Sequence, residues 1–305
     1  MIILDCRCLK SDIQFNTDAL EKLVYEPEWA LENEEVFWST FPAQKNVRRW
    51  SEKNNWPIDY KGWRKTMKEW IGTPIEKRKN MDFLRNAEWI IQEKQVFIEK
   101  VLPYICSYLP EETVLDIGIY FTAYIPPRAI AMEEIVINMT ATYWNNNPNN
   151  ILNAMVHELF HVGYDYCEKQ RDNEVNDDPF LNILKDIHNE GVCTYIGYMA
   201  QGIFPAPDEK DYHMLDNPSE VKRHLKEVKN VLSKIGKISE DKLKKLAWDT
   251  GVISRSFYVT GAHMSRVIME KTGKENYKQT LLDGPEAFFR IYNTLVTSEA
   301  QLSIS

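Results

Sequence analysis

Residues 153–161 read Asn-Ala-Met-Val-His-Glu-Leu-Phe-His and contain the pattern His-Glu-x-x-His. On an α-helix, His157 and His161 are four residues apart and lie on one face, so both imidazoles can reach a single zinc ion at about 2.0–2.1 Å. Such a helix also needs a buried side, which its apolar residues supply: Met155, Val156, Leu159 and Phe160. We therefore predict a zinc-binding helix at this point of the chain.

Glu158 directly follows the first histidine and lies one position further round the helix. From there its carboxylate can hydrogen-bond to a metal-bound water without ligating the metal, which is the position of a general base. The chain has six histidines in 305 residues. Because histidine is this scarce, two of them around one glutamate favour a metal site over two solvated helix residues.

A catalytic zinc takes three protein ligands and keeps one position open. Downstream, Glu190 lies 29 residues beyond His161, which leaves room for a turn and a returning helix. We favour Glu190 as the third ligand. Gly191 beside it allows another helix to approach closely. His188 is a weaker alternative, because residues two apart on a helix point about 200° from each other.

Two further residues bear on the metal site. The metzincin pattern places glycine seven and histidine ten residues after the first histidine, and here Tyr164 and Cys167 stand at those positions. Cys167 therefore stays an alternative third ligand. Thr194, one helical turn after Glu190, is a candidate for a hydrogen bond to a ligating histidine.

The pattern formed by residues 157–161 and Asn189-Glu190-Gly191 resembles the gluzincins, the thermolysin-like clan of zinc metallopeptidases. The segments Tyr258–Met264 and Gly284–Phe289 are similar to a bacterial family of zinc-dependent peptidases that lack a defined substrate. This similarity covers about residues 100–297. The HExxH motif is specific to zinc peptidases as a whole, whereas the downstream glycine segments are less specific.

The resemblance implies a complete set of roles. His157, His161 and Glu190 would ligate zinc, and Glu158 would be the base. The strand near Ile135–Met139 would be the edge strand on which an extended substrate pairs.

Two departures from the clan matter. Thr194 stands where thermolysin itself has an aspartate, which leaves the tuning of the ligands open. No Gly-x-Met-Glu-Asn signature precedes His157, which argues against the aminopeptidase branch.

A peptidase also needs a donor for the oxyanion of its tetrahedral intermediate. Tyr258 and His263 lie in one predicted helix with Gly261 between them. Residues five apart on a helix are about 140° apart, so at most one of the two is expected to point at the site. The alternative is that Tyr258 is a core aromatic and His263 a packing or surface residue.

The rest of the sequence predicts a mainly helical α+β protein, with a small antiparallel sheet packed on the zinc-binding helix. Residues 114–124 and 134–139 are rich in β-branched and aromatic residues and predict two strands. A capping box at Thr73–Glu76 predicts a helix that starts at Pro74, and an apolar stripe carries a helix toward Pro103. The spaced tryptophans of the first 70 residues are expected to anchor helices to a core.

Further helix boundaries follow from local signals. The zinc-binding helix should open at Ile151, and boundaries are expected at Asn217-Pro218, Ser239, Thr250, Gly273 and Gly284-Pro285. We expect an N-terminal helical region over residues 1–105 and a metallopeptidase-like catalytic region over 106–305, or one continuous domain.

Composition limits the partners. Acidic residues number 45 against 37 basic ones, which gives a formal charge of −8 and disfavours nucleic acid. No run approaches 18 apolar residues, so no membrane partner is expected. The N-terminus lacks the features of a secretory signal, and the five cysteines are odd in number and mostly far apart. These features predict reduced thiols and a cytoplasmic protein.

Together these features predict a zinc-dependent peptidase that hydrolyses a peptide or protein substrate with a zinc-activated water. Two alternatives stay open: a zinc-binding regulatory protein without turnover, and a zinc hydrolase of a non-peptide amide. The sequence leaves the oligomeric state and the choice between endo- and exopeptidase undecided.

Overall fold

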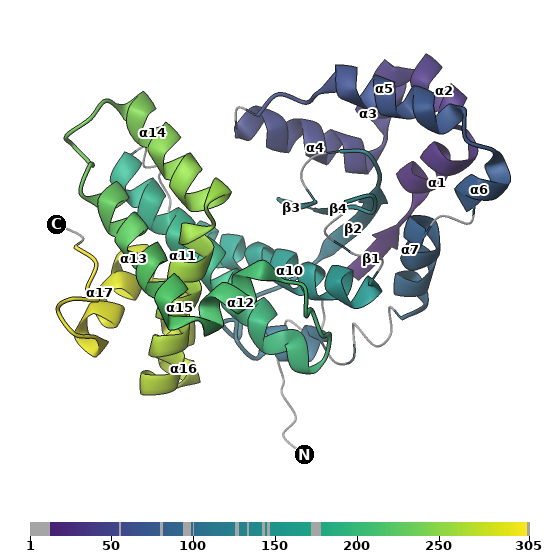
Figure 1. Ribbon diagram of the computed structural model, residues 1–305. Coiled ribbons are helices and arrows are strands. Elements are labelled where there is room, and N and C mark those ends of the chain that lie inside the picture. Colours follow the sequence, from purple (N-terminus) through teal and green to yellow (C-terminus); the bar gives the residue numbers. More distant parts are fainter. Residues whose placement is uncertain are drawn as a thin grey trace. The chain divides into compact units, whose positions relative to one another are not determined.

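The computed structural model describes residues 13–54, 56–79, 82–93, 99, 101–125, 128–132, 134–141, 144, 147–171 and 178–303. In this part of the chain the protein is mainly helical with a small sheet, which confirms the predicted α+β class (Figure 1). The chain forms two compact units. We call residues 10–102 and 115–162 the sheet unit, and residues 1–9, 103–114 and 163–305 the helical unit. Whether residues 1–105 and 106–305 are separate regions stays a prediction.

The sheet has four strands in the order β1-β2-β4-β3. Their bounds are Ile13–Asn16 for β1, Ile117–Thr122 for β2, Ala129–Ala131 for β3 and Ile135–Asn138 for β4. Strands β2 and β4 are the two that the sequence predicts. β1 pairs parallel with β2 and β2 parallel with β4, whereas β3 runs antiparallel to β4.

The prediction of an antiparallel sheet is therefore wrong, because the sheet is mixed. After β2 the chain reverses through the short strand β3, so that β4 again runs in the direction of β2. This arrangement also places β4 between β2 and β3. The strand near Ile135–Met139 is thus an interior strand, and the expectation that it is the edge strand is wrong.

Amphipathic helices cover the sheet within the sheet unit. Helices α1 and α4 pack on β2, and α4 also contacts β4. A buried hydrogen bond joins α4 to the sheet, because Gln44 Nε2 donates to Thr122 Oγ1 at 2.7 Å. The helix bounds are Asp18–Tyr25 for α1, Pro27–Glu32 for α2, Glu34–Thr40 for α3, Pro42–Lys53 for α4, Tyr60–Ile71 for α5, Ile75–Lys79 for α6 and Asp82–Gln92 for α7.

Tryptophans anchor these helices, as the sequence predicts. Trp38, Trp63 and Trp70 are almost fully buried. The rings of Trp38 and Trp63 meet edge to face with their centroids 5.9 Å apart, and Trp70 Nε1 donates to the carbonyl oxygen of Leu23 at 3.0 Å. The polar end of Trp70 is thereby satisfied inside the core.

The apolar stripe toward Pro103 is helical in α7, which spans Asp82–Gln92, and in α9, which spans Leu102–Cys106; residues 94–98 and 100 between them lie outside the described part of the chain. Proline lacks the N–H that a helix interior requires but suits the first turn, so Pro103 lies near the start of a helix rather than at its end. For the same reason the HExxH helix, α10, spans Pro148–Arg171 and begins before Ile151.

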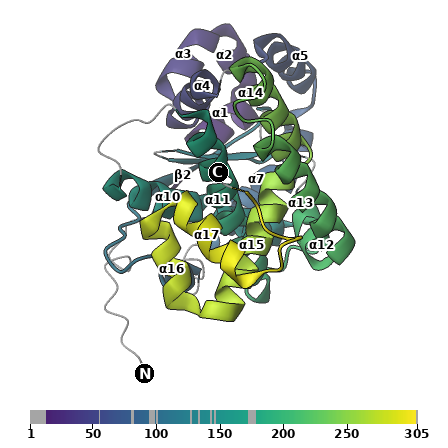
Figure 2. The same cartoon turned by 90° about the vertical axis from the view of Figure 1, so that its left-hand side faces the viewer.

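The helical unit is built around α15 (Figure 2). This helix packs against α11, α12, α13, α16 and α17. The bounds are Pro179–Met199 for α11, Lys210–Asp216 for α12, Pro218–Leu232 for α13, Glu240–Trp248 for α14, Ser256–Thr272 for α15, Lys274–Asp283 for α16 and Pro285–Leu295 for α17. The predicted boundaries at Asn217, Ser239, Gly273 and Gly284 are confirmed as capping positions. Thr250 instead lies inside a π-helical turn over Asp249–Ile253.

Two glycines let α11 and α15 touch backbone to backbone. A Cβ atom on Gly191 would overlap the main chain of Gly261, and one on Gly261 would overlap the carbonyl oxygen of Ile187. The predicted close approach of a helix at Gly191 is therefore confirmed, and α15 is that helix.

The cysteines are only partly as predicted. Cys167 and Cys193 are free and buried, but Cys106 is disulfide-bonded, so the expectation of reduced thiols is wrong for Cys106. Cys6 and Cys8 lie outside the described residues. Because disulfides persist mainly in oxidising compartments, the thiols no longer support a cytoplasmic location, which stays a prediction.

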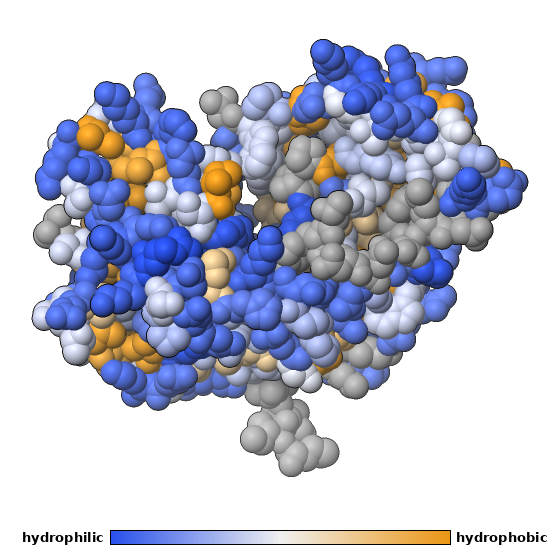
Figure 3. All heavy atoms as spheres, viewed as in Figure 1, coloured by the Kyte–Doolittle hydropathy of each residue, from blue (hydrophilic) through white to orange (hydrophobic). Residues whose placement is uncertain are grey.

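Among the described residues, no helix combines the length and the apolar character that crossing a bilayer requires. On the face drawn in Figure 3, hydrophilic residues predominate and apolar ones form small separate groups.

The α11–α15 contact leads to a stability prediction. We expect G191A and G261A each to lower the free energy of unfolding by about 1–3 kcal/mol, since the added methyl group must push two backbones apart. G202A is the matched control, because Gly202 faces open space without a left-handed φ. Urea unfolding followed by far-UV circular dichroism measures the effect. Equal stabilities for G261A and G202A would contradict the backbone contact.

Candidate metal centre

Three side chains converge on one point. His157 and His161 project from α10, and Glu190 projects from α11. Their ligand atoms all lie within 4.8 Å of one another, and no other group of three metal-ligating side chains is found among the described residues. The sequence predicted these three residues as the metal ligands.

The two histidines meet as the i, i+4 spacing requires. Their Nε2 atoms are 3.0 Å apart, and the rings are nearly perpendicular at a centroid separation of 4.7 Å. Two nitrogens bound at about 2.0–2.1 Å to one tetrahedral ion are roughly 3.3 Å apart, so the observed separation agrees to within a few tenths of an ångström. Two imidazole nitrogens and one carboxylate oxygen are also a donor set that zinc accepts in catalytic sites. The residues therefore fit zinc.

The alternative third ligands lie elsewhere. Cys167 is 1 % exposed, and burial raises the pKa of its thiol. His188 is fully buried: its Nδ1 lies 3.1 Å from the hydroxyl of Tyr164, and its ring stacks on Phe288 at 4.2 Å. Burial, followed by the charge of Arg171, holds the pKa of His188 well below its ordinary value. Neither residue belongs to the cluster.

Glu158 and Thr194 are both buried. Glu158 is 8 % exposed and lies on α10 next to the first ligand, and its role as the base stays a prediction. Thr194 is 2 % exposed, and its hydroxyl has no hydrogen-bond partner among the described residues. The expected hydrogen bond from Thr194 to a ligating histidine is therefore not formed.

Tyr258 and His263 share α15, as the sequence predicts, but their surroundings differ. Tyr258 is 8 % exposed and lies one turn before Gly261, the residue that touches α11 beside Glu190. The ring of His263 instead faces Tyr292 of α17 at 6.1 Å, and burial lowers its pKa to about 4. Of the two candidates, Tyr258 lies on the side of α15 nearer to Glu190.

A family model described as "Putative zinc dependent peptidase (DUF5700)" matches residues 14–301. The chain belongs to this family. No curated protein and no solved structure matches it.

The zinc dependence in the description of this peptidase family agrees with the predicted cofactor. Both the family and the His-His-Glu cluster indicate zinc. The match also covers both compact units rather than residues 106–305 alone.

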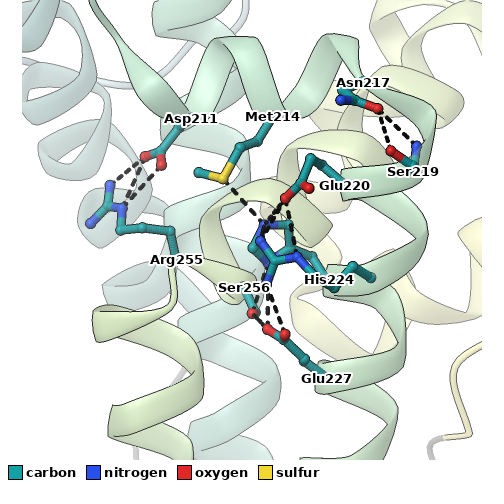
Figure 4. A network of polar contacts seen from close by, with 10 residues as sticks. Asp211, Met214, Asn217, Ser219, Glu220, His224, Glu227, Arg255 and Ser256 are labelled. Atoms are coloured by element: carbon teal, nitrogen blue, oxygen red, sulfur yellow. Dashed lines mark hydrogen bonds and ion pairs between the residues drawn. The ribbon is translucent and has the colours of Figure 1, made fainter.

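In this member of the zinc-dependent peptidase family, the sequence analysis missed a buried ion pair in the helical unit, formed by Asp211 and Arg255. Arg255 Nε lies 3.2 and 3.0 Å from the two carboxylate oxygens of Asp211, and Nη2 lies 2.5 Å from Oδ2. Burial alone would lower the pKa of Arg255, but Asp211 above all, followed by Tyr258 and Glu190, holds it above its ordinary value. No local pattern joins residues 44 positions apart, so only the fold reveals this pair (Figure 4).

A closed ring of hydrogen bonds lies next to this ion pair. Arg223 Nη2 lies 2.8 Å from His224 Nε2, and because a guanidinium can only donate, Nε2 accepts and Nδ1 carries the proton. His224 Nδ1 then donates to Ser256 Oγ at 2.9 Å, and Ser256 donates to Glu227 at 2.5 Å. Arg223 Nη1 closes the ring on Glu227 at 2.8 Å. The ring joins α13 to the first residue of α15.

The ring requires a neutral imidazole. Burial, and then the charge of Arg223, lowers the pKa of His224. His188, His224 and His263 thus all resist protonation in the folded state.

These histidines predict acid sensitivity. A folded-state pKa of about 4 for His263 lies below the value of about 6.5 in an unfolded chain, so the unfolded state binds more protons. The contribution of His263 is therefore complete above about pH 6.5 and is lost as the pH falls toward 4, by as much as about 3 kcal/mol.

Urea unfolding of the zinc-free protein between pH 7.5 and 4.5, in wild type and H263Q, measures this effect. We expect H263Q to lose less stability than wild type over this range. An unchanged pH slope in H263Q would contradict the lowered pKa of His263.

Proposed function

We propose that the protein is a zinc-dependent peptidase of the gluzincin type, with peptides or proteins as substrates. The convergence of His157, His161 and Glu190 carries this proposal, because the ligands come from HExxH on one helix and a glutamate on the next. Membership in the zinc-dependent peptidase family supports it. The net charge of −8 disfavours nucleic acid as an alternative substrate.

In this mechanism His157, His161 and Glu190 would hold the metal. When bound, zinc supplies a Lewis acid that polarises the scissile carbonyl and makes water a better nucleophile at neutral pH. Glu158 accepts the proton of the attacking water and delivers it to the leaving nitrogen, so the amine departs uncharged. The burial of Glu158 keeps competing solvent away from this transfer.

Tyr258 is the donor that we propose for the oxyanion of the tetrahedral intermediate. Its position beside the helix crossing at Gly261 favours it over His263, whose ring packs on Tyr292. A phenol is a neutral donor, so it stabilises the developing charge without a change in its own protonation.

The first test separates base from ligand. We expect E158Q to bind one zinc per chain and to lose peptide hydrolysis by about 10²–10⁴-fold, because an amide cannot accept the proton. E168Q, on the same helix, is the matched control; Glu168 pairs with Lys185. Metal content by mass spectrometry and kcat on a peptide library are the measurements. A zinc-loaded E158Q with wild-type kcat would refute the mechanism.

A second test concerns the ligand set. E190A should weaken zinc binding by more than about 10²-fold, beyond the loss typical for an outer-shell partner. C167A should leave the affinity unchanged, since Cys167 lies outside the cluster. Competition with a chromogenic chelator gives both affinities. If E190A binds zinc as tightly as the parent, the gluzincin assignment fails.

Hydrolysis assays with peptide and with non-peptide amide substrates distinguish the peptidase from the two alternative functions. Zinc-loaded protein that cleaves no peptide but hydrolyses a small non-peptide amide would be an amidase of another class. Zinc-loaded protein that is inert to both kinds of substrate would have a binding or regulatory role.

A further inference from the structure

Arg255 has an unusual backbone conformation at the start of α15. It is the residue directly before α15 and has φ 62° and ψ 19°, in the left-handed region. L-residues with long side chains rarely adopt this conformation, and such residues concentrate at functional sites. Glycine would fit this backbone best. Arginine at this position therefore points to a function of its side chain that offsets the backbone strain.

The guanidinium of Arg255 is fixed from two sides. Asp211 of α12 is 3 % exposed and binds both Nε and Nη2, which sets the plane of the group. On the other side, the central carbon of the guanidinium lies 3.1 Å from the centroid of the Tyr258 ring. A cation over the face of a phenol ring is attracted to the ring electrons. Because the guanidinium is planar and stacks on the ring, it limits the orientations that the ring can adopt.

Ser256, the next residue, fixes the same turn of α15 through separate hydrogen bonds. Ser256 is fully buried and belongs to the ring of hydrogen bonds with His224 and Glu227 on α13. The start of α15 is therefore tied to α12 through Arg255 and to α13 through Ser256 (Figure 4). The backbone from which Tyr258 projects, one turn of helix, has little freedom to move.

Glu190 connects this turn with the metal ligands. It precedes Gly191, which touches the main chain of Gly261 on α15, one helical turn after Tyr258. An oxyanion donor acts well only if it is held in advance within a few tenths of an ångström of its position in the reaction.

We propose that Arg255, clamped by Asp211, is a positioning residue that fixes the Tyr258 phenol for oxyanion stabilisation. The proposal rests on the peptidase function described above. Arg255 acts through the ring of Tyr258 and does not itself touch the substrate. Asp211 keeps the guanidinium in plane, and the left-handed backbone at Arg255 lets its side chain fold back over a residue three positions later.

Three substitutions of Arg255 separate the side chain from the backbone. R255G suits the left-handed backbone but removes the whole side chain. R255M keeps a long side chain without the charge, and R255K keeps the charge without the planar guanidinium. We expect kcat to fall by about 10–10²-fold in R255G and R255M, with KM changed by less than about threefold and one zinc retained. R255K should recover part of the loss. R64M is the matched control, because Arg64 forms a bidentate pair with the more exposed Glu34.

A double-mutant cycle tests whether Arg255 acts through Tyr258. Y258F should lower kcat by about 10²–10³-fold, and R255M added to Y258F should lower it less than about twofold further. Full additivity would overturn the proposal. A wild-type kcat in R255G would also overturn it, since the side chain would then have only a structural role. A fall in zinc affinity large enough to explain the lost activity would assign Arg255 to Glu190 instead.

A measurement on zinc-free protein tests the positioning without turnover. With 3-fluorotyrosine at position 258, the fluorine NMR resonance should shift in R255M and D211N but not in R64M. An unmoved resonance would overturn the positioning role even in an active enzyme. A shifted resonance in a protein that cleaves no peptide would confirm the contact while the proposed function fails.

Discussion

The backbone contact between Gly191 and Gly261 is the constraint on which the candidate functional residues of the helical unit depend. It brings α11 and α15 closer than any pair of larger side chains would allow. Glu190 is the neighbour of one glycine, and Tyr258 lies one turn from the other. Because both helices are rigid over this distance, a candidate metal ligand and a candidate hydrogen-bond donor are placed by a packing contact made entirely of main-chain atoms.

Polar contacts hold the start of α15 in one arrangement. Asp211 and Arg255 form an ion pair in which one partner is almost fully buried. Burial of charge is costly unless the hydrogen-bonding capacity is used, and here each carboxylate oxygen of Asp211 accepts from the guanidinium. The neighbouring ring through His224 has one consistent direction of donation. Order at the start of α15 thus comes from directional contacts rather than from apolar packing alone.

Sequence reasoning found the candidate metal ligands because the signals that mark them lie close together in the sequence. His157 and His161 are related by helix geometry, and Gly191 marked the helix that carries Glu190 as a place of close approach. Asp211 and Arg255 could not be found in this way, because neither residue belongs to a periodic pattern and their pairing depends on how α12 meets α15. The direction of β4 was also out of reach. Its apolar run predicts a strand, but the parallel pairing with β2 depends on the three-residue strand β3, which no composition signal marks.

The short edge of the sheet has a consequence for selectivity. Among the described strands, β1 and β3 form the two edges, and β3 has only three residues. A strand of this length offers an added peptide only one or two main-chain hydrogen bonds, which are the same for every sequence. Discrimination between peptides would then rest on pockets for individual side chains. If peptides are the substrates and pair on β3, a few residues near the cleaved bond would distinguish them, and a long extended segment would add little to their affinity.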